Sequence, residues 1–127
     1  MNSDGKHILY VEDHADTRIL MSLMLKEAGF RVTETTNGEE ALKAARAGDF
    51  DMYLLDHTYP DVSGVTLCLS IREFDRQTPI VFDSGRALPE EKQAALDAGA
   101  QDYLIKPDDL FNVTSHVAKW TGSGAAD

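Results

Sequence analysis

The chain is predicted to fold as a doubly wound α/β domain, in which helices cover both faces of a parallel sheet. Short apolar runs alternate with segments of helical spacing, and five such strand-and-helix repeats can be counted. Four of the apolar runs end in polar residues: Ile8–Val11, Met52–Leu55, Ile80–Phe82 and Tyr103–Ile105. Because the carboxyl ends of parallel strands open onto one edge of the sheet, we expect these polar residues to meet there.

The first half of the chain predicts two helices around a second strand. A helix is expected over residues 16–28, ended by Gly29, and an edge-like strand follows over 30–35. Asn37 can then cap a helix over 38–47. In the first of these helices, the side chains at helical neighbour spacing are Leu20, Leu23, Met24 and Glu27.

Capping residues and prolines bound the remaining helices. Ser63 can cap the third helix, and Pro89 suits the first turn of the fourth. The expected helices end at about Phe74, at Ala98 and at Lys119, and the last one starts at Asp108 or Asp109. We expect one domain over residues 5–120, followed by a flexible tail or a truncated linker over 121–127.

Composition limits the classes of function. The chain of 127 residues has a net charge of −10, which disfavours direct binding to nucleic acid or to an anionic membrane. Its single cysteine, Cys68, excludes an internal disulfide framework and is expected to be a buried structural thiol. The first apolar run is too short for a signal peptide or a membrane span. The cytoplasm is therefore the expected compartment.

The motifs at the strand ends resemble those of a response-regulator receiver domain, the phosphoacceptor module of two-component signalling. They are Glu12-Asp13, residues 56–64, Pro79 to Gly85 and residues 99–107, in this order along the chain. Each motif is weak alone, but together they are a strong signal, and the resemblance extends over roughly residues 5–120. The resemblance implies five strands in the order 2-1-3-4-5, the flavodoxin-like winding of the CheY-like superfamily.

The resemblance implies that Asp56 is the phosphoacceptor. A histidine kinase, a histidine phosphotransfer protein or a small acyl phosphate would supply the phosphoryl group. By the family pattern Asp13 and Asp56 bind Mg²⁺ or Mn²⁺ directly, the backbone carbonyl of Thr58 is a third ligand, and Glu12 acts through water. Crowded carboxylates need such a cation, since each pair about 5 Å apart costs roughly 3 kcal/mol at an effective dielectric near 20.

The same pattern gives roles to four further residues. Lys106 would offset the charge of Asp56 and later hold a phosphoryl oxygen, while Ser84 would donate its hydroxyl to another. Ser84 and Tyr103 would form the conformational switch. Its output to a downstream protein would appear on the face made by the fourth helix, fifth strand and fifth helix. Thr58 and Arg86 stand at the positions that tune phosphoryl lifetime.

One residue departs from the family pattern in a way that bears on the site. Asp83 stands where an apolar residue is usual. Strand alternation predicts that it points to the face opposite Ser84, so we expect it to lie outside the metal site. We also expect it to reach solvent at the strand end, beside a polar partner such as Arg86. His57 is expected to be a turn residue rather than an acid or base.

Three other functions compete with a phosphoacceptor switch. A non-phosphorylated adaptor would not need Asp13, Asp56, Ser84 and Lys106 together. A Mg²⁺-dependent aspartyl-phosphate phosphatase usually has a second aspartate where Thr58 stands. A flavodoxin-like carrier would place a flavin phosphate against an acidic turn over residues 12–16. The sequence therefore favours the switch, with the adaptor as the alternative, and predicts no classical enzyme.

Overall fold

In the computed structural model, which describes residues 5–85, 88–106 and 113–122, five parallel strands alternate with five helices. The strands lie in the order β2-β1-β3-β4-β5, which confirms the predicted flavodoxin-like winding. The strands are β1 (His7–Val11), β2 (Arg31–Thr35), β3 (Met52–Leu55), β4 (Ile80–Ser84) and β5 (Asp102–Ile105). The helices are α1 (Ala15–Glu27), α2 (Gly38–Ala47), α3 (Gly64–Arg72), α4 (Pro89–Asp97) and α5 (Val113–Thr121).

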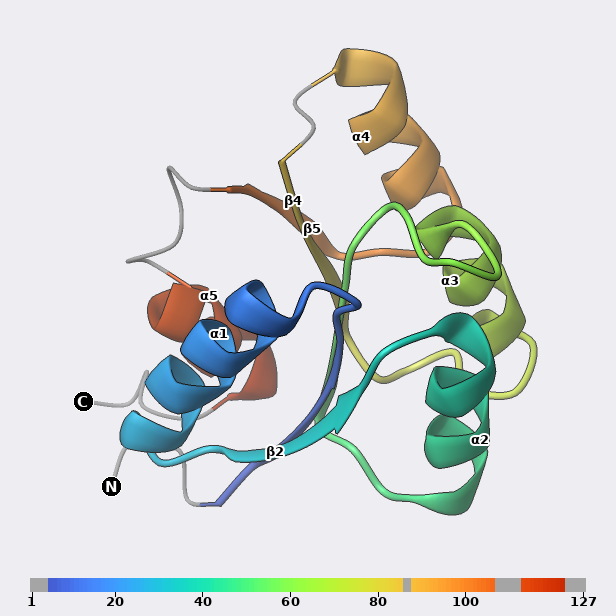
Figure 1. Ribbon diagram of the computed structural model, residues 1–127. Coiled ribbons are helices and arrows are strands. Elements are labelled where there is room, and N and C mark those ends of the chain that lie inside the picture. The colour runs from blue at the N-terminus through green and yellow to red at the C-terminus, as the bar shows by residue number, and fades with distance from the viewer. Residues whose placement is uncertain (1–4, 86–87, 107–112, 123–127) are drawn as a thin grey trace.

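Helices cover both faces of the sheet, with α1 and α5 on one side and α2, α3 and α4 on the other (Figure 1). Successive strand residues therefore point into different cores. On the α1–α5 side, Ile8 and Leu54 are buried, whereas Leu9 and Leu55 are buried on the α2–α3–α4 side. Burial on both faces explains why the central strands read as continuous apolar runs.

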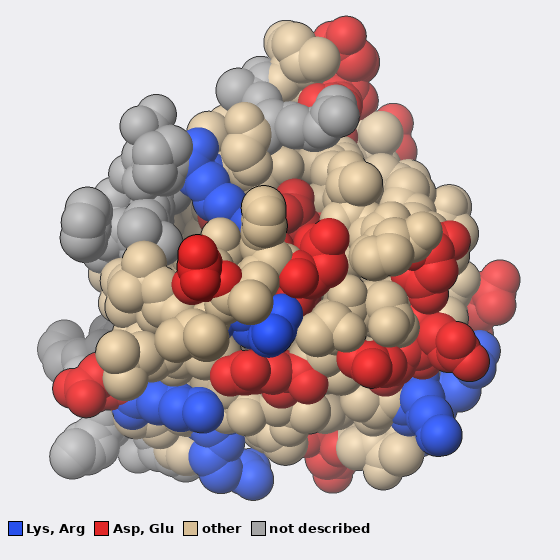
Figure 2. Space-filling view, in the orientation of Figure 1, with Lys and Arg blue, Asp and Glu red and all other residues tan. Residues whose placement is uncertain are grey.

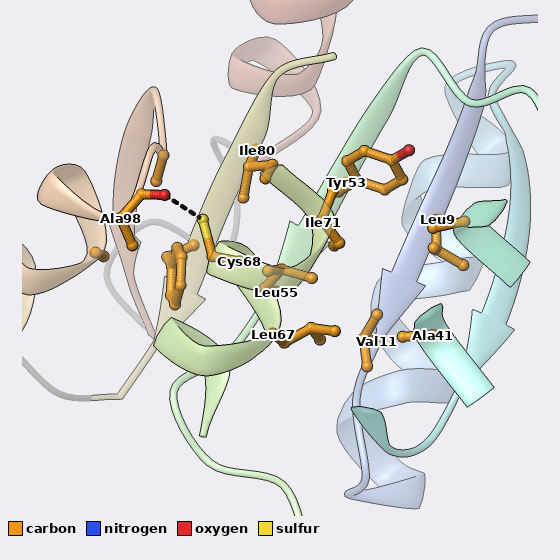
Figure 3. Close-up of a cluster of buried hydrophobic side chains, with 14 of the residues drawn as sticks. Leu9, Val11, Ala41, Tyr53, Leu55, Leu67, Cys68, Ile71, Ile80 and Ala98 are labelled. Carbon is orange, nitrogen blue, oxygen red and sulfur yellow. Dashed lines mark hydrogen bonds between the residues drawn. The ribbon is translucent and has the colours of Figure 1, made fainter. Parts of the chain in front are cut away.

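The core on the α2–α3–α4 side also holds the single cysteine. Cys68 is buried, and its thiol donates to the carbonyl oxygen of Ala98 at 3.4 Å (Figure 3). Burial raises the pKa of this thiol to about 11. Figure 3 also shows Leu55, Leu67 and Ile80 packed around it. The expectation of a buried structural thiol is confirmed.

Helix boundaries follow the predicted caps closely. The Asn37 side chain accepts a hydrogen bond from the Glu40 amide at 2.8 Å, and α2 has the expected bounds. Ser63 caps α3 by accepting from the Thr66 amide at 3.0 Å, but this helix ends at Arg72, before the predicted end. For α5, the predicted start at Asp108 or Asp109 lies outside the described residues.

The sequence did not identify the buried side of α1. Leu20 and Leu23 are exposed, and the side chains that α1 buries are Met21, Ser22 and Leu25. Apolar residues occur almost all round this helix, so spacing alone allowed more than one apolar stripe. The stripe that includes Met21 and Leu25 faces the sheet, and the other faces outward. No helix among residues 5–85, 88–106 and 113–122 is long and apolar enough to cross a membrane.

Candidate functional site

Three charged side chains from separate strand ends meet at one edge of the sheet. The Lys106 ammonium donates to a Glu12 carboxylate oxygen at 2.8 Å and to an Asp56 carboxylate oxygen at 3.1 Å. These residues follow β5, β1 and β3, which all run in the same direction. The contacts join positions 94 and 50 residues apart in the chain. Parallel strand order thus assembles a compact ionic site.

The backbone and the electrostatic surroundings both hold Lys106 in place. Its amide donates to the Ser84 carbonyl oxygen at 2.7 Å, which ties the residue to the end of β4. Burial alone would lower the pKa of its ammonium, but the carboxylates of Asp56, Glu12 and Asp83 outweigh burial and raise that pKa. Lys106 is therefore a fixed positive charge within the site at neutral pH.

Asp56 begins a tightly tied loop between β3 and α3. Its Oδ1 accepts from the His57 amide at 2.6 Å, while the Gly64 amide donates to the His57 carbonyl oxygen at 2.7 Å. The start of α3 passes so close to this turn that a Cβ at Gly64 would collide with the carbonyl oxygen of Asp56. Glycine at this position therefore lets the loop fold back beside Asp56.

The two acidic residues after β1 occupy different environments. Glu12 is only 2% exposed, and its second oxygen accepts from the His14 amide at 3.1 Å. The backbone carbonyl oxygen of Glu12 accepts a hydrogen bond from the Arg18 guanidinium at 2.9 Å. Asp13 is exposed. Glu12 is thus already held by protein groups, whereas the Asp13 carboxylate is open to an ion from solvent.

The donor set fits a hard cation that keeps part of its water shell. Within the part of the chain that the structure describes, no three His, Cys, Asp or Glu side chains form a group that could hold a metal by themselves. Mg²⁺ does not need such a cage, because it binds through one or two carboxylates plus water and phosphate oxygens. Asp13 and Asp56 can supply those carboxylates, since each carboxylate has about four lone-pair sites. The ligand roles of Glu12, Asp13, Asp56 and Thr58 stay predictions.

Ser84 and Tyr103 are both buried. Ser84 is a β4 residue, and by alternation its side chain lies on the same face as Phe82. The Tyr103 ring is stacked on Phe82, with centroids 6.0 Å apart and planes within 5°. His57 joins them, with its ring 5.4 Å from that of Tyr103. The roles of Ser84 and Tyr103 in switching stay predictions, and Arg86 lies outside the described residues.

The position of Asp83 corrects one expectation. Asp83 is 2% exposed, so the predicted escape of its carboxylate to solvent is wrong. Val81, two residues earlier on β4, is buried on the α1–α5 side, and strand alternation places the Asp83 side chain on this same side, opposite Ser84. Its charge contributes to raising the pKa of both Lys106 and Tyr10, and so it lies near the ionic site.

Sequence reasoning missed two residues of the loop after β3. His57 is more than the plain turn residue expected, because its ring contacts Phe82 and Tyr103. Nothing in the sequence assigned a role to Tyr59, yet its buried hydroxyl contacts the backbone of both β1 and the Asp56 turn. The only sequence signal was the presence of two aromatic side chains among the three residues that follow Asp56.

On the face of the molecule seen in Figure 2, acidic side chains are spread widely between uncharged residues, with fewer Lys and Arg among them. This distribution matches the net charge of −10. A phosphorylated ligand approaching the site meets a largely negative surface, so a local positive charge is needed to hold it. In the described part of the site, Lys106 provides that charge.

A family model described as response regulator receiver domain matches residues 8–118. Among curated proteins, the uncharacterized transcriptional regulatory protein YkoG of Bacillus subtilis is 35% identical over 111 residues. The match covers 87% of this chain but 49% of YkoG, so the chain spans about half the length of that relative.

Solved structures agree in fold. The receiver domain of sensor histidine kinase PA1611 from Pseudomonas aeruginosa, with magnesium in its active site cleft, is 31% identical with a TM-score of 0.86, over 94% of this chain and 99% of that one. The response regulator TrrA from Thermotoga maritima, in complex with Mg²⁺ and a beryllium fluoride, is 28% identical with a TM-score of 0.83, over 91% of this chain and 98% of that one.

Proposed function

Because the chain belongs to the response regulator receiver family of two-component systems, we propose that Asp56 accepts a phosphoryl group from a histidine kinase or a histidine phosphotransfer protein. A small acyl phosphate would serve as a second donor. The observation that carries the proposal is the position of the Lys106 ammonium, which contacts both Asp56 and Glu12. The chain is a phosphoacceptor switch rather than a classical enzyme.

The proposed chemistry needs alignment and neutralisation of charge more than acid–base catalysis. A carboxylate oxygen of Asp56 attacks phosphorus while the P–N bond of phosphohistidine breaks, and the imidazole leaves with the bonding electrons. The product is a mixed anhydride on Asp56. Lys106 would hold one phosphoryl oxygen and the Ser84 hydroxyl would donate to another. The chain itself would therefore promote its own phosphorylation. It would also supply the groups that align a water molecule for hydrolysis of the anhydride on Asp56.

We propose that Asp13 and Asp56 bind Mg²⁺ directly, with the Thr58 carbonyl as a third ligand and Glu12 acting through water. Mn²⁺, which prefers similar oxygen ligands, would substitute. When bound, the ion would neutralise the carboxylates and the incoming phosphoryl oxygens. Support comes from the all-oxygen donor set and from the magnesium in the related PA1611 and TrrA structures.

The proposed switch connects the site to a protein-binding surface. After phosphorylation Ser84 would move toward the phosphoryl group, and Tyr103 would report this change to the α4–β5–α5 face. The stacking of Tyr103 on Phe82, which is two residues before Ser84 on the same strand, supports this path. Thr58 and Arg86 would set how long the phosphoryl group survives.

The proposed partners are proteins. A phosphohistidine-bearing protein would act upstream and a second protein or domain downstream, in the cytoplasm, with no direct contact to nucleic acid or membrane. The net charge of −10 supports the last point, because nucleic-acid backbones and anionic lipids repel such a chain. The relative YkoG is about twice as long as the matched region.

The decisive test is intact-mass analysis after incubation with acetyl phosphate, with and without Mg²⁺. We expect one added phosphate in the presence of Mg²⁺, released by hydroxylamine, and none on Asp56→Asn. Asp51→Asn, at the opposite end of β3, is the matched control and should be labelled normally. Labelling of folded Asp56→Asn at the wild-type level would refute the site, and no labelling of wild type would favour the adaptor.

A further inference from the structure

The hydroxyl of Tyr59 bridges the end of β1 and the turn at Asp56. It accepts a hydrogen bond from the Asp56 amide at 2.6 Å and donates one to the Val11 carbonyl oxygen at 2.9 Å. Tyr59 is 5% exposed, and its ring packs within the core on the α2–α3–α4 side. Burial holds the pKa of the phenol well above its usual value, so the hydroxyl keeps its proton and can make both bonds.

This hydroxyl replaces a missing backbone hydrogen bond of the sheet. Pairing between β1 and β3 ends at Tyr10 and Leu54. In β3 the Tyr53 amide faces away from β1 and donates to the carbonyl oxygen of Pro79, the residue before β4, so amides at even positions of β3 face β1. The next bond of a regular parallel ladder would therefore run from the Asp56 amide to the Val11 carbonyl. The Tyr59 hydroxyl stands between these two groups, so here the strands are joined through a side chain.

The bridge fixes the two backbone segments that carry the proposed metal ligands. Val11 immediately precedes Glu12 and Asp13, and the bridged amide belongs to Asp56 itself. Tyr59 cannot shift freely, because its own amide donates to the Val62 carbonyl oxygen at 3.1 Å. A rigid phenol anchored at its backbone and at its hydroxyl therefore sets how far apart the ends of β1 and β3 stand.

We infer that Tyr59 is a positioning residue, whose hydroxyl sets the separation of the Asp13 and Asp56 carboxylates for divalent-cation binding and phosphoryl transfer. The inference rests on the proposed function. Without the hydroxyl, the Asp56 amide and the Val11 carbonyl would either lose their partners or close directly on each other. Both outcomes change the distance between the carboxylates, and Mg²⁺ tolerates little deviation from its octahedral geometry.

Tyr59→Phe tests the inference, because it removes the hydroxyl and keeps the buried ring. The chain offers a matched control in Tyr53→Phe: Tyr53 is also a buried phenol in the same core, but its hydroxyl donates to Asp75 at 2.8 Å, away from the site. Asp13→Ala serves as the reference for a lost metal ligand. For each variant we would measure Mg²⁺ affinity by calorimetry, the rate of labelling by acetyl phosphate, and thermal unfolding.

We expect Tyr59→Phe to bind Mg²⁺ about tenfold more weakly and to be labelled more slowly, as for the loss of one buried hydrogen-bonded group. Tyr53→Phe should lower the unfolding temperature but leave Mg²⁺ affinity and labelling unchanged. Wild-type affinity and labelling in folded Tyr59→Phe would overturn the inference while leaving the proposed function intact. If wild type bound no Mg²⁺ and Asp13→Ala changed nothing, the proposed function itself would fail.

A measurement on wild type covers the case in which Tyr59→Phe does not fold. The Asp56 amide donates to a buried phenol, so its hydrogen exchange should be strongly protected without any metal. Exchange of this amide as fast as that of an exposed loop amide would show that the bridge does not persist in solution, and would overturn the inference.

Discussion

Asp83 adds a negative charge to the surroundings of Lys106, which already pairs with two carboxylates. Glu12 and Asp56 contact Lys106 directly, and the charge of Asp83 also acts on that ammonium. Lys106 thus makes hydrogen-bonded ion pairs with two carboxylates, and Asp83 acts on it electrostatically. A like-charge pair about 5 Å apart costs roughly 3 kcal/mol at an effective dielectric near 20, and attraction to Lys106 offsets part of this. Asp83 therefore increases the repulsion within the site when no cation is bound.

We predict that Asp83→Asn raises the free energy of unfolding of the metal-free protein by about 1 kcal/mol. Labelling of Asp56 by acetyl phosphate should persist, because Asp83 is not among the proposed ligands. Urea unfolding without divalent cations measures the first effect and intact mass the second. Loss of labelling in folded Asp83→Asn would place this carboxylate inside the reacting site.

At the scale of single residues, sequence order predicted which groups gather but not how they contact. Glu12, Asp56 and Lys106 could be brought together because parallel strand ends share one edge of the sheet. The bridging hydroxyl of Tyr59 could not be foreseen, because it depends on the pairing of β1 and β3 ending at Tyr10 and Leu54, two residues before the site. The burial of Asp83 likewise depends on what covers its strand end, which strand alternation does not reveal.

At the scale of elements, Asp75 ties together the connection between α3 and β4. One carboxylate oxygen accepts from the amides of Gln77 and Thr78, each at 3.1 Å, and the other accepts from the Tyr53 hydroxyl at 2.8 Å. Burial alone would raise the pKa of Asp75, but the hydrogen bonds outweigh burial and lower it from 3.8 to about 2. The ionised carboxylate therefore stabilises this connection.

We predict that Asp75→Asn lowers the free energy of unfolding by about 1 kcal/mol at pH 7. The pKa of Asp75 is lower in the folded than in the unfolded protein, so its contribution is complete above pH 3.8 and is lost as pH falls toward 2. The difference between variant and wild type should shrink over that interval in urea unfolding, while the exposed Asp49→Asn serves as a control for lost charge. A difference that stayed constant from pH 7 to pH 2 would contradict this account.

Helix caps were predictable because each depends on a few neighbouring residues. Asn37 and Ser63 cap the helices that the sequence assigned to them. The buried side of α1 was not predictable in the same way. Leu20, Leu23 and Leu25 all fit some helical stripe, and only packing against the sheet selects the stripe that includes Leu25.

For the whole molecule, the outward stripe of α1 suggests how a phosphoryl donor approaches. Ile19, Leu20 and Leu23 are 62%, 47% and 55% exposed. The helix starts at Ala15, two residues after Asp13, so its first turn is next to the site in the chain, and the helix extends from there along the sheet (Figure 1). A protein that brings a phosphohistidine to Asp56 has to contact the surface around that site. Exposed apolar side chains there provide area that such a partner can bury.

We predict that Leu20→Ser together with Leu23→Ser slows labelling of Asp56 by a histidine kinase that phosphorylates wild type, by about tenfold or more. Two large apolar contacts would be lost, at about 25 cal/mol per Å² of buried area. Labelling by acetyl phosphate should be unchanged, because a small donor needs no docking surface. Leu69→Ser is the control, since Leu69 is 52% exposed on α3, on the other side of the sheet. If the α1 variant accepted phosphate from the kinase as fast as wild type, or if acetyl phosphate labelling fell equally, α1 would not be the docking surface.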